Sequence, residues 1–167
     1  MHIISAHIEK LNTLYVTGLQ KALDMEQKIV KALPEMIKAA KDQDLIRGFE
    51  THLQQTKGHV SKVEGLLREH TRSANAKTCL VIDALVKEAQ ATIKDVTQPE
   101  VRDVALISAA QQVEHHEIAV YGGIRRWAGI LGFSQDEATL KSIEAEEGQT
   151  DQLLSKMAES INSLAAV

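Results

Sequence analysis

The sequence contains little of several residue types on which common fold classes depend. Aromatic residues make up 3 % of its 167 residues, and it has two prolines and one cysteine. β-Sandwiches usually accumulate aromatic side chains and threonine, so the shortage of rings favours helices packed on helices. The single cysteine, Cys79, excludes an intramolecular disulfide and agrees with a reducing cytoplasm. We therefore predict an all-α, cytoplasmic protein.

The chain also lacks the signals of a membrane protein or a nucleic-acid-binding protein. No run approaches the roughly 18 apolar residues of a membrane span, and the N-terminus has no basic stretch followed by a long apolar one. The formal net charge is −4, and no cluster of Lys and Arg is interleaved with aromatic residues. We expect neither a membrane nor a nucleic acid as a partner.

Apolar residues are plentiful, and their spacing predicts long helices. The sequence is 44 % hydrophobic and 25 % charged, which suits one domain over residues 1–167 with a substantial core. Apolar positions recur at intervals of three and four, the period of an amphipathic helix. The four long helices are predicted at about residues 3–41, 42–70, 99–131 and 135–164.

Local signals near the predicted helix ends support these boundaries. Asp42 or Asp44 can cap the second helix. Thr97-Gln-Pro-Glu100 and Ser134-Gln-Asp-Glu137 have the pattern of a capping box, in which a Ser or Thr and a Glu satisfy free backbone amides reciprocally. Pro34 lies inside the first helix and predicts a kink there.

The connections between the predicted helices indicate a topology. The first and third links are short, which forces antiparallel neighbours, whereas the second link is long and carries a further short helix at about residues 80–93. A long link lets the chain cross the length of the bundle. We therefore predict a ferritin-like four-helix bundle with a long crossover.

Acidic side chains lie among apolar residues of the predicted helices. Glu114 and Glu117 are three residues apart and share a helix face with Tyr121. An unpaired carboxylate in an apolar bundle costs several kcal/mol unless a metal ion, another cation or protonation compensates for its charge. This placement predicts one of those three forms of compensation.

The four long helices together supply carboxylates and imidazoles to one interior region. Such a set is the ligand set expected of a two-metal iron or manganese centre that handles oxygen or peroxide. A histidine in an apolar stripe is more often a hydrogen-bonded core residue than a ligand, and this interpretation is favoured for His59, whereas for His52 the two roles are about equally expected. Glu144 keeps the inward phase less securely than Glu147. The candidate metal ligands are Glu26, His52, His59, Glu114, Glu117, Glu144 and Glu147.

Several neighbours of these ligands have other predicted positions. His115 and His116 turn away from the adjacent glutamates and are expected on the flanks of their helix. Glu146 is expected on a solvated face. Asp151 follows Glu147 by one turn and could support a ligand, while Tyr121 could donate a hydrogen bond to a bound carboxylate or simply fill the core. Cys79 is expected to be a packing residue.

At these residues the sequence resembles the YciE/YciF family of bacterial stress-associated, ferritin-like proteins over nearly its whole length. The most specific string is Val113-Glu-His-His-Glu-Ile-Ala-Val-Tyr121. The other matching strings are Met25-Glu26-Gln-Lys, Lys31-Ala-Leu-Pro34, Phe49-Glu-Thr-His52-Leu-Gln-Gln-Thr56, Val101-Arg-Asp-Val-Ala-Leu-Ile and Glu146-Glu147 with Asp151.

The resemblance implies a ferritin-like bundle that forms a homodimer, with a two-metal site at Glu26, His52, Glu114, Glu117 and Glu147. The sequence departs from the family pattern at Gln55, where relatives often carry a carboxylate, and at Glu144, where they carry leucine. The leading expectation is an iron or manganese protein of the stress response. The alternative is a metal-free helical interaction protein with a vestigial site.

Overall fold

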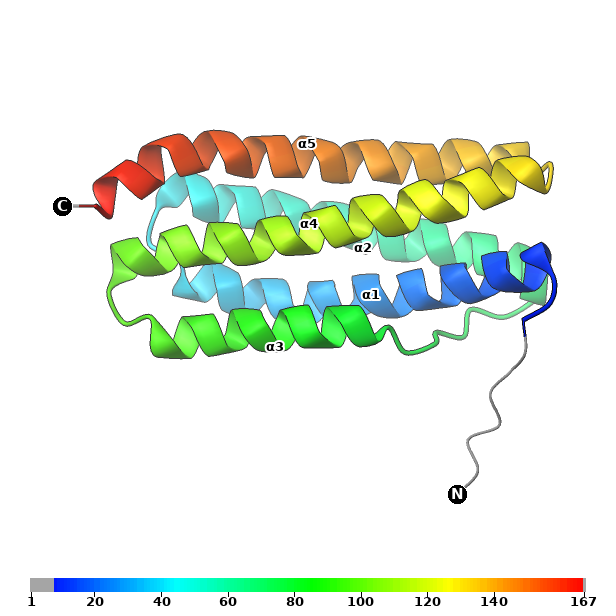
Figure 1. Ribbon diagram of the computed structural model, residues 1–167, viewed down its shortest axis with the longest axis horizontal. Coiled ribbons are helices and arrows are strands. Elements are labelled where there is room, and N and C mark those ends of the chain that lie inside the picture. Colours follow the sequence, from blue (N-terminus) through cyan, green and yellow to red (C-terminus); the bar gives the residue numbers. More distant parts are fainter. Residues whose placement is uncertain (1–7, 167) are drawn as a thin grey trace, which may run out of the picture.

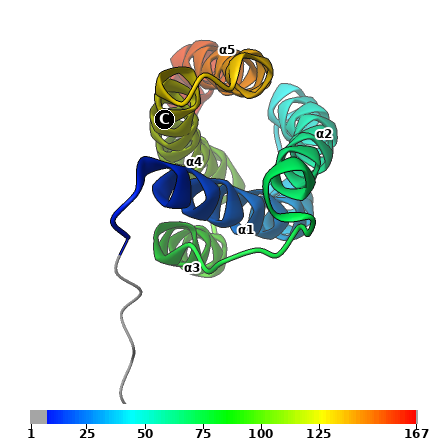
Figure 2. The ribbon, with the colours of Figure 1, turned by 90° about the vertical axis from the view of Figure 1, so that its right-hand side faces the viewer.

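The computed structural model describes residues 8–166, which form five helices and no strand. The helices are α1 (Leu11–Ala39), α2 (Gln43–Thr71), α3 (Leu80–Asp95), α4 (Pro99–Ile130) and α5 (Ser134–Leu164). The four long helices surround a common interior, and α3 lies outside them against α1 and α4 (Figure 2). The all-α, ferritin-like bundle predicted from the sequence is confirmed. Among the described residues, no helix combines the length and apolarity needed to cross a membrane.

The order of the helices follows the predicted crossover. Short turns join α1 to α2 and α4 to α5, so each pair runs antiparallel (Figure 1). The segment from residue 72 to residue 98 carries α3 and returns the chain along the outside of the bundle to the end where α4 begins (Figure 1). As a result, all four long helices run past the midpoint of the bundle, where their interior faces meet.

The start of the first helix differs from the sequence prediction. The helix was expected from about Ile3, but residues 8–10 are not helical and α1 begins at Leu11. The expected residues 3–7 lie outside the described part of the chain. Lys10 occupies the N-cap position with an extended backbone and no side-chain cap. Because lysine has no acceptor to offer the free backbone amides, the helix start depends on packing of its apolar face.

Both predicted capping boxes are wrong, although the helix starts near them are right. Gln98 and Phe133 occupy the N-cap positions, and neither makes a side-chain cap. Pro99 is the first residue of α4 and has no amide hydrogen to satisfy. Before α5, Gly132 adopts a positive φ of 77° and the Phe133 amide donates to the Ala128 carbonyl, which places the next residue, the serine of the predicted box, already inside the helix.

Two aspartates fix the turn between α1 and α2. Asp42 caps α2, as predicted, by accepting hydrogen bonds from the amides of Asp44 and Leu45. Asp103, on α4 and 2 % exposed, accepts from the amides of Lys41 and Asp42, each at 2.8 Å. The turn is therefore tied to the opposite half of the bundle by a buried carboxylate.

Replacing Asp103 with alanine is expected to lower the free energy of unfolding by about 3 kcal/mol, because two hydrogen bonds to a charged group are lost and two amides lose their acceptor. Urea denaturation would measure the change. Glu100→Ala is a suitable control on the same helix, since the Glu100 side chain pairs with the surface side chain of Lys41 and its loss should lower the free energy of unfolding by less than about 1 kcal/mol. Equal stability of the two variants would contradict this role for Asp103.

A polar cluster closes the other end of the bundle. The Tyr15 hydroxyl donates to Asp136 Oδ2 at 2.7 Å, and His70 Nε2 lies 2.6 Å from the same oxygen. The rings of Tyr15 and His70 meet edge to face at 5.4 Å, and Phe133 packs against both. This cluster joins α1, α2 and α5 to the turn between α4 and α5.

The outer helix α3 is anchored at its first turn. The Cys79 amide donates to Asp24 Oδ2 at 2.8 Å, and Lys28 bridges Asp24 and Asp83 at 2.6 and 2.5 Å. Cys79 is 6 % exposed, so its predicted packing role is confirmed, and Ile82 is fully buried. These contacts hold α3 across the groove between α1 and α4.

Candidate metal centre

Six side chains with a carboxyl or imidazole group are buried at the middle of the bundle, and each long helix supplies at least one. The structure thus brings together residues far apart in the sequence, as predicted. None of the six is more than 3 % exposed. They are Glu26 from α1, His52 and His59 from α2, Glu114 and Glu117 from α4, and Glu147 from α5.

Four of these residues form a first group around one point. His52 Nε2 lies 3.2 Å from Glu114 Oε1 and 4.0 Å from Glu117 Oε2, and His52 Nδ1 lies 3.9 Å from Glu147 Oε2. One donor atom from each of the four residues lies within 4.8 Å of the others. Such a group can hold a metal ion.

A second group shares one residue with the first. His59 Nδ1 lies 2.9 Å from Glu147 Oε1 and 3.7 Å from Glu26 Oε1. Donor atoms of these three residues also lie within 4.8 Å of one another. Because Glu147 belongs to both groups, one carboxylate lies between two places where a cation can bind.

The donors at this centre are poorly satisfied by the protein itself. Nine buried side-chain nitrogen and oxygen atoms in the described part of the chain have no hydrogen-bond partner, and all belong to the six residues. They include both ring nitrogens of His52 and both carboxylate oxygens of Glu117 and of Glu147. Unpartnered polar atoms are costly in a dry interior. Oxygen-rich donors with two imidazoles suit iron or manganese, so the residues present fit such ions.

Without a metal ion, three of the carboxyl groups, those of Glu26, Glu114 and Glu117, favour their protonated form. Burial and then the charge of Glu147 raise the pKa of Glu26 from 4.5 to about 8 and that of Glu114 from 4.5 to about 10. The same two causes raise the pKa of Glu117 well above its usual value. Protonation is therefore the compensation that the protein can supply alone.

The two histidines differ in their charge state. Burial lowers the pKa of His52, so its ring is neutral and has a free nitrogen for a metal ion. Burial also acts to lower the pKa of His59, but the contact and charge of Glu147 outweigh it and raise that pKa to about 9. His59 Nε2 additionally lies 2.8 Å from Glu146 Oε2. In the absence of metal, His59 is thus a buried cation in contact with Glu146 and Glu147.

One hydroxyl group contacts a ligand side chain, and a second bonds the backbone of the helix that carries His52. Tyr121, fully buried on α4, donates a hydrogen bond to Glu26, which is the supporting contact considered from the sequence. The Thr56 hydroxyl donates to the His52 carbonyl at 2.8 Å, one turn along α2. The contact from Tyr121 restricts the orientations available to the Glu26 carboxyl group.

Glu144 is the one predicted ligand that the structure places elsewhere. Its Oε2 lies 2.6 Å from Arg125 Nε on α4, and it belongs to neither group of donors. The prediction rested on helical phase, but Glu144 is partly exposed and its charge is neutralised by arginine. Arg125 lies one turn after Tyr121, and this basic residue was the sequence feature that could have indicated a partner for Glu144 outside the centre.

Glu146 was wrongly placed on a solvated face. Its side chain is 29 % exposed and contacts both His59 and Lys62, the latter at 3.0 Å. Burial raises its pKa, but the bonds to His59 and Lys62 prevail and lower it. Lys62, three residues after His59 on one helix face, could have indicated that an acidic partner was needed there.

The remaining neighbours lie at the edge of the centre. His115 is exposed, as predicted, and lies 3.4 Å from Asp151 Oδ1. His116 is half-buried on the flank of α4, where its Nε2 lies 3.6 Å from Cys79 Sγ. Asp151 accepts a hydrogen bond from Gln111 and touches no ligand directly, although its charge helps to raise the pKa of Glu114.

Comparison with known sequences shows the family to which these residues belong. The family described as "Domain of unknown function (DUF892)" matches residues 10–166. Protein YciF of Escherichia coli strain K12 is 30 % identical over 153 residues, which cover 91 % of this chain and 92 % of YciF.

Two solved structures have the same fold. The E. coli stress protein YciF superposes with a TM-score of 0.89 and 29 % identity, over 93 % of this chain and 99 % of that one. YcfI from Rhodopseudomonas palustris, described as a candidate structural protein, gives a TM-score of 0.88 and 33 % identity, over 92 % and 98 % of the two chains. The resemblance predicted from the sequence is confirmed, and this chain, which carries the DUF892 domain, belongs to the YciE/YciF family.

Proposed function

We propose that this protein is a non-haem, two-metal iron or manganese protein of the stress response that handles oxygen or peroxide. The observation that carries the proposal is the position of Glu147, whose two oxygens face two separate groups of buried donors. A shared carboxylate is the usual bridge of two-metal centres in ferritin-like bundles. The nine unpartnered donor atoms provide the independent support.

The ligands of the proposed centre divide into two sets. Glu114, Glu117 and His52 would hold one ion, Glu26 and His59 the other, and Glu147 both. Bound iron or manganese would supply one-electron chemistry toward oxygen or peroxide. The protein excludes bulk water, keeps the His52 ring neutral and aims the Tyr121 hydroxyl proton at Glu26.

Metal analysis tests the proposal directly. After anaerobic loading with ferrous iron or manganese and removal of unbound ions, we expect about two equivalents per chain, as ferritin-like carboxylate centres hold. For iron, exposure to air should produce the absorption band of an oxo-bridged ferric pair. Less than about a tenth of an equivalent of either metal would refute the proposal, since structural contacts alone would then satisfy the site.

A metal-free interaction protein is the second candidate. YcfI, which has the same fold, is described as a candidate structural protein, and part of the centre here is already paired, as His59 with Glu146 and Tyr121 with Glu26. This candidate predicts that a Glu114→Gln, Glu117→Gln variant keeps full stability and assembly when metals are supplied. A metalloprotein would instead lose its metal-dependent stabilisation. The homodimer and the cytoplasmic location remain predictions, which sedimentation and cell fractionation would measure.

A further inference from the structure

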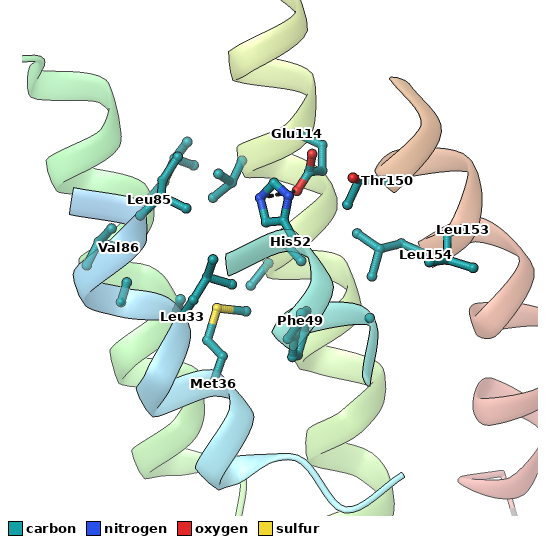
Figure 3. Close-up of a pocket in the computed structure, with 17 residues that line it drawn as sticks. Leu33, Met36, Phe49, His52, Leu85, Val86, Glu114, Thr150, Leu153 and Leu154 are labelled. Atoms are coloured by element: carbon teal, nitrogen blue, oxygen red, sulfur yellow. Dashed lines mark ion pairs between the residues drawn. The ribbon is translucent and has the colours of Figure 1, made fainter. Parts of the chain in front are cut away.

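An apolar cavity lies directly beside the candidate metal centre. It measures about 40 Å³ and is bounded by side chains from all five helices, mostly aliphatic or aromatic ones such as Leu33, Met36, Phe49 and Leu85 (Figure 3). The outer helix α3 contributes Ala89, whose small side chain leaves space where a larger one would fill it. The outer helix thus has a second role, as one wall of this cavity.

Two candidate metal ligands form the polar end of the cavity. His52 and Glu114 line it, and the figure shows them facing one another at one end, with Met36 and Phe49 at the other (Figure 3). Both ring nitrogens of His52 lack a hydrogen-bond partner although its side chain is only 4 % exposed. The cavity therefore leads to donor atoms that the protein leaves free.

The size and lining of the cavity restrict what can occupy it. A space of this size holds a molecule of the dimensions of water or dioxygen and excludes a lipid or a nucleotide. Water needs two to four polar partners, which the apolar end lacks. On the other side, Leu153 lines the cavity and is 42 % exposed, so the space extends toward the surface beside α5. A small apolar molecule is the occupant that fits.

We propose that this cavity binds a small apolar molecule of the size of dioxygen and admits it to the metal centre on the side of His52 and Glu114. Binding requires only the cavity, whereas admission to bound metal rests on the function proposed above. Charged oxidants and hydrated ions would be disfavoured by the apolar walls. The geometry thus assigns dioxygen, rather than an ionic substrate, to this entrance.

Xenon and the variant Ala89→Phe test the proposal. Xenon occupies dry apolar cavities, so the metal-free wild-type protein should show a saturable ¹²⁹Xe shift, or a xenon atom in pressurised crystals. Ala89→Phe fills the space from α3, far in sequence from every ligand, and should weaken xenon binding at least fivefold. Ala91→Phe is the matched control, because Ala91 is exposed on the same helix. This variant should bind xenon as the wild type does. Ala89→Leu replaces the first variant if phenylalanine prevents folding.

The loaded protein provides the second measurement. With iron bound, Ala89→Phe should slow oxidation by dioxygen five- to tenfold without changing the number of ions bound, and Ala91→Phe should leave the rate unchanged. Absence of xenon binding to the wild type would refute the cavity site. Xenon loss with an unchanged oxidation rate would refute admission by this route. Failure to bind metal would refute the proposed function and admission with it, while the xenon result would still decide whether the cavity is a binding site.

Discussion

Glu147→Gln is expected to reduce metal binding from about two equivalents per chain to less than about 0.2. Among the described residues, Glu147 alone belongs to both donor groups, with its oxygens 2.9 Å from His59 and 3.9 Å from His52. Glutamine keeps the shape of the side chain but loses the negative charge that offsets the repulsion between two neighbouring cations, and it offers only one acceptor oxygen. Changes one step outside a metal site already cost ten- to a hundredfold in affinity, so loss of a shared ligand should cost at least about a hundredfold. Metal analysis after loading would measure the loss.

Glu144→Gln is the matched control for this prediction. The substitution is the same and lies one turn earlier on α5, but Glu144 contacts Arg125 and not the donors of the centre. This variant should bind as much metal as the wild type. If both variants bound equally little metal, Glu144 would be a ligand after all. The different roles that the structure gives to Glu144 and Glu147 would then be wrong.

Much of the fold could be predicted from the sequence because helical periodicity and connection length are local properties. The spacing of apolar residues located all five helices to within a few residues, apart from the start of α1. The lengths of the links then indicated the topology, in which two antiparallel helix pairs are joined by a long crossover. The capping boxes failed because a box needs Ser or Thr at the cap itself, and the flanking backbone placed Gln98 and Phe133 there.

The candidate site was also largely predictable, because Glu114, Glu117 and Glu147 share the phase of buried neighbours. Phase alone could not distinguish an inward carboxylate from one turned toward a basic residue on the next helix. Glu144 and Glu146 differ in this respect: Arg125 draws the first away, whereas Lys62 and His59 hold the second against the centre. Those pairings depend on the relative rotation of helices, which a single sequence does not contain.

The cavity and the cluster of Tyr15, His70 and Asp136 at the end of the bundle also depend on how the helices are rotated relative to one another. Each is built from side chains of three or more helices, so no local pattern marks it. Asp136 lies in the first turn of α5, where acidic residues are common, yet it is 4 % exposed and accepts a hydrogen bond from a tyrosine on α1. Contacts between distant helices therefore supply what helical periodicity leaves undetermined.

The metal-free protein is expected to lose stability as the pH rises from 5 to 9. A carboxyl group whose pKa is higher in the folded than in the unfolded state binds its proton more tightly when folded. Its contribution is complete below the usual pKa of 4.5 and disappears as the pH rises through the folded value, about 8 for Glu26 and about 10 for Glu114. His59, whose pKa is raised to about 9, acts in the same direction above its usual 6.5, whereas the lowered pKa of His52 opposes it weakly.

The expected size of this effect is large. At about 1.4 kcal/mol for each pH unit, Glu26 alone would lower the free energy of unfolding by about 4 kcal/mol between pH 5 and pH 8, or the unfolding temperature by roughly 10 °C. The metal-loaded protein provides the control, because its free energy of unfolding should change with pH in the opposite direction. Metal ions bind the deprotonated carboxylates, so the stabilisation that they give the folded protein should grow with pH. Thermal unfolding of both forms between pH 5 and pH 9 would measure the two slopes. A metal-free protein whose stability stayed level or rose over this range would show that its buried glutamates are ionised without metal, and that His59 and its neighbours are enough to balance them.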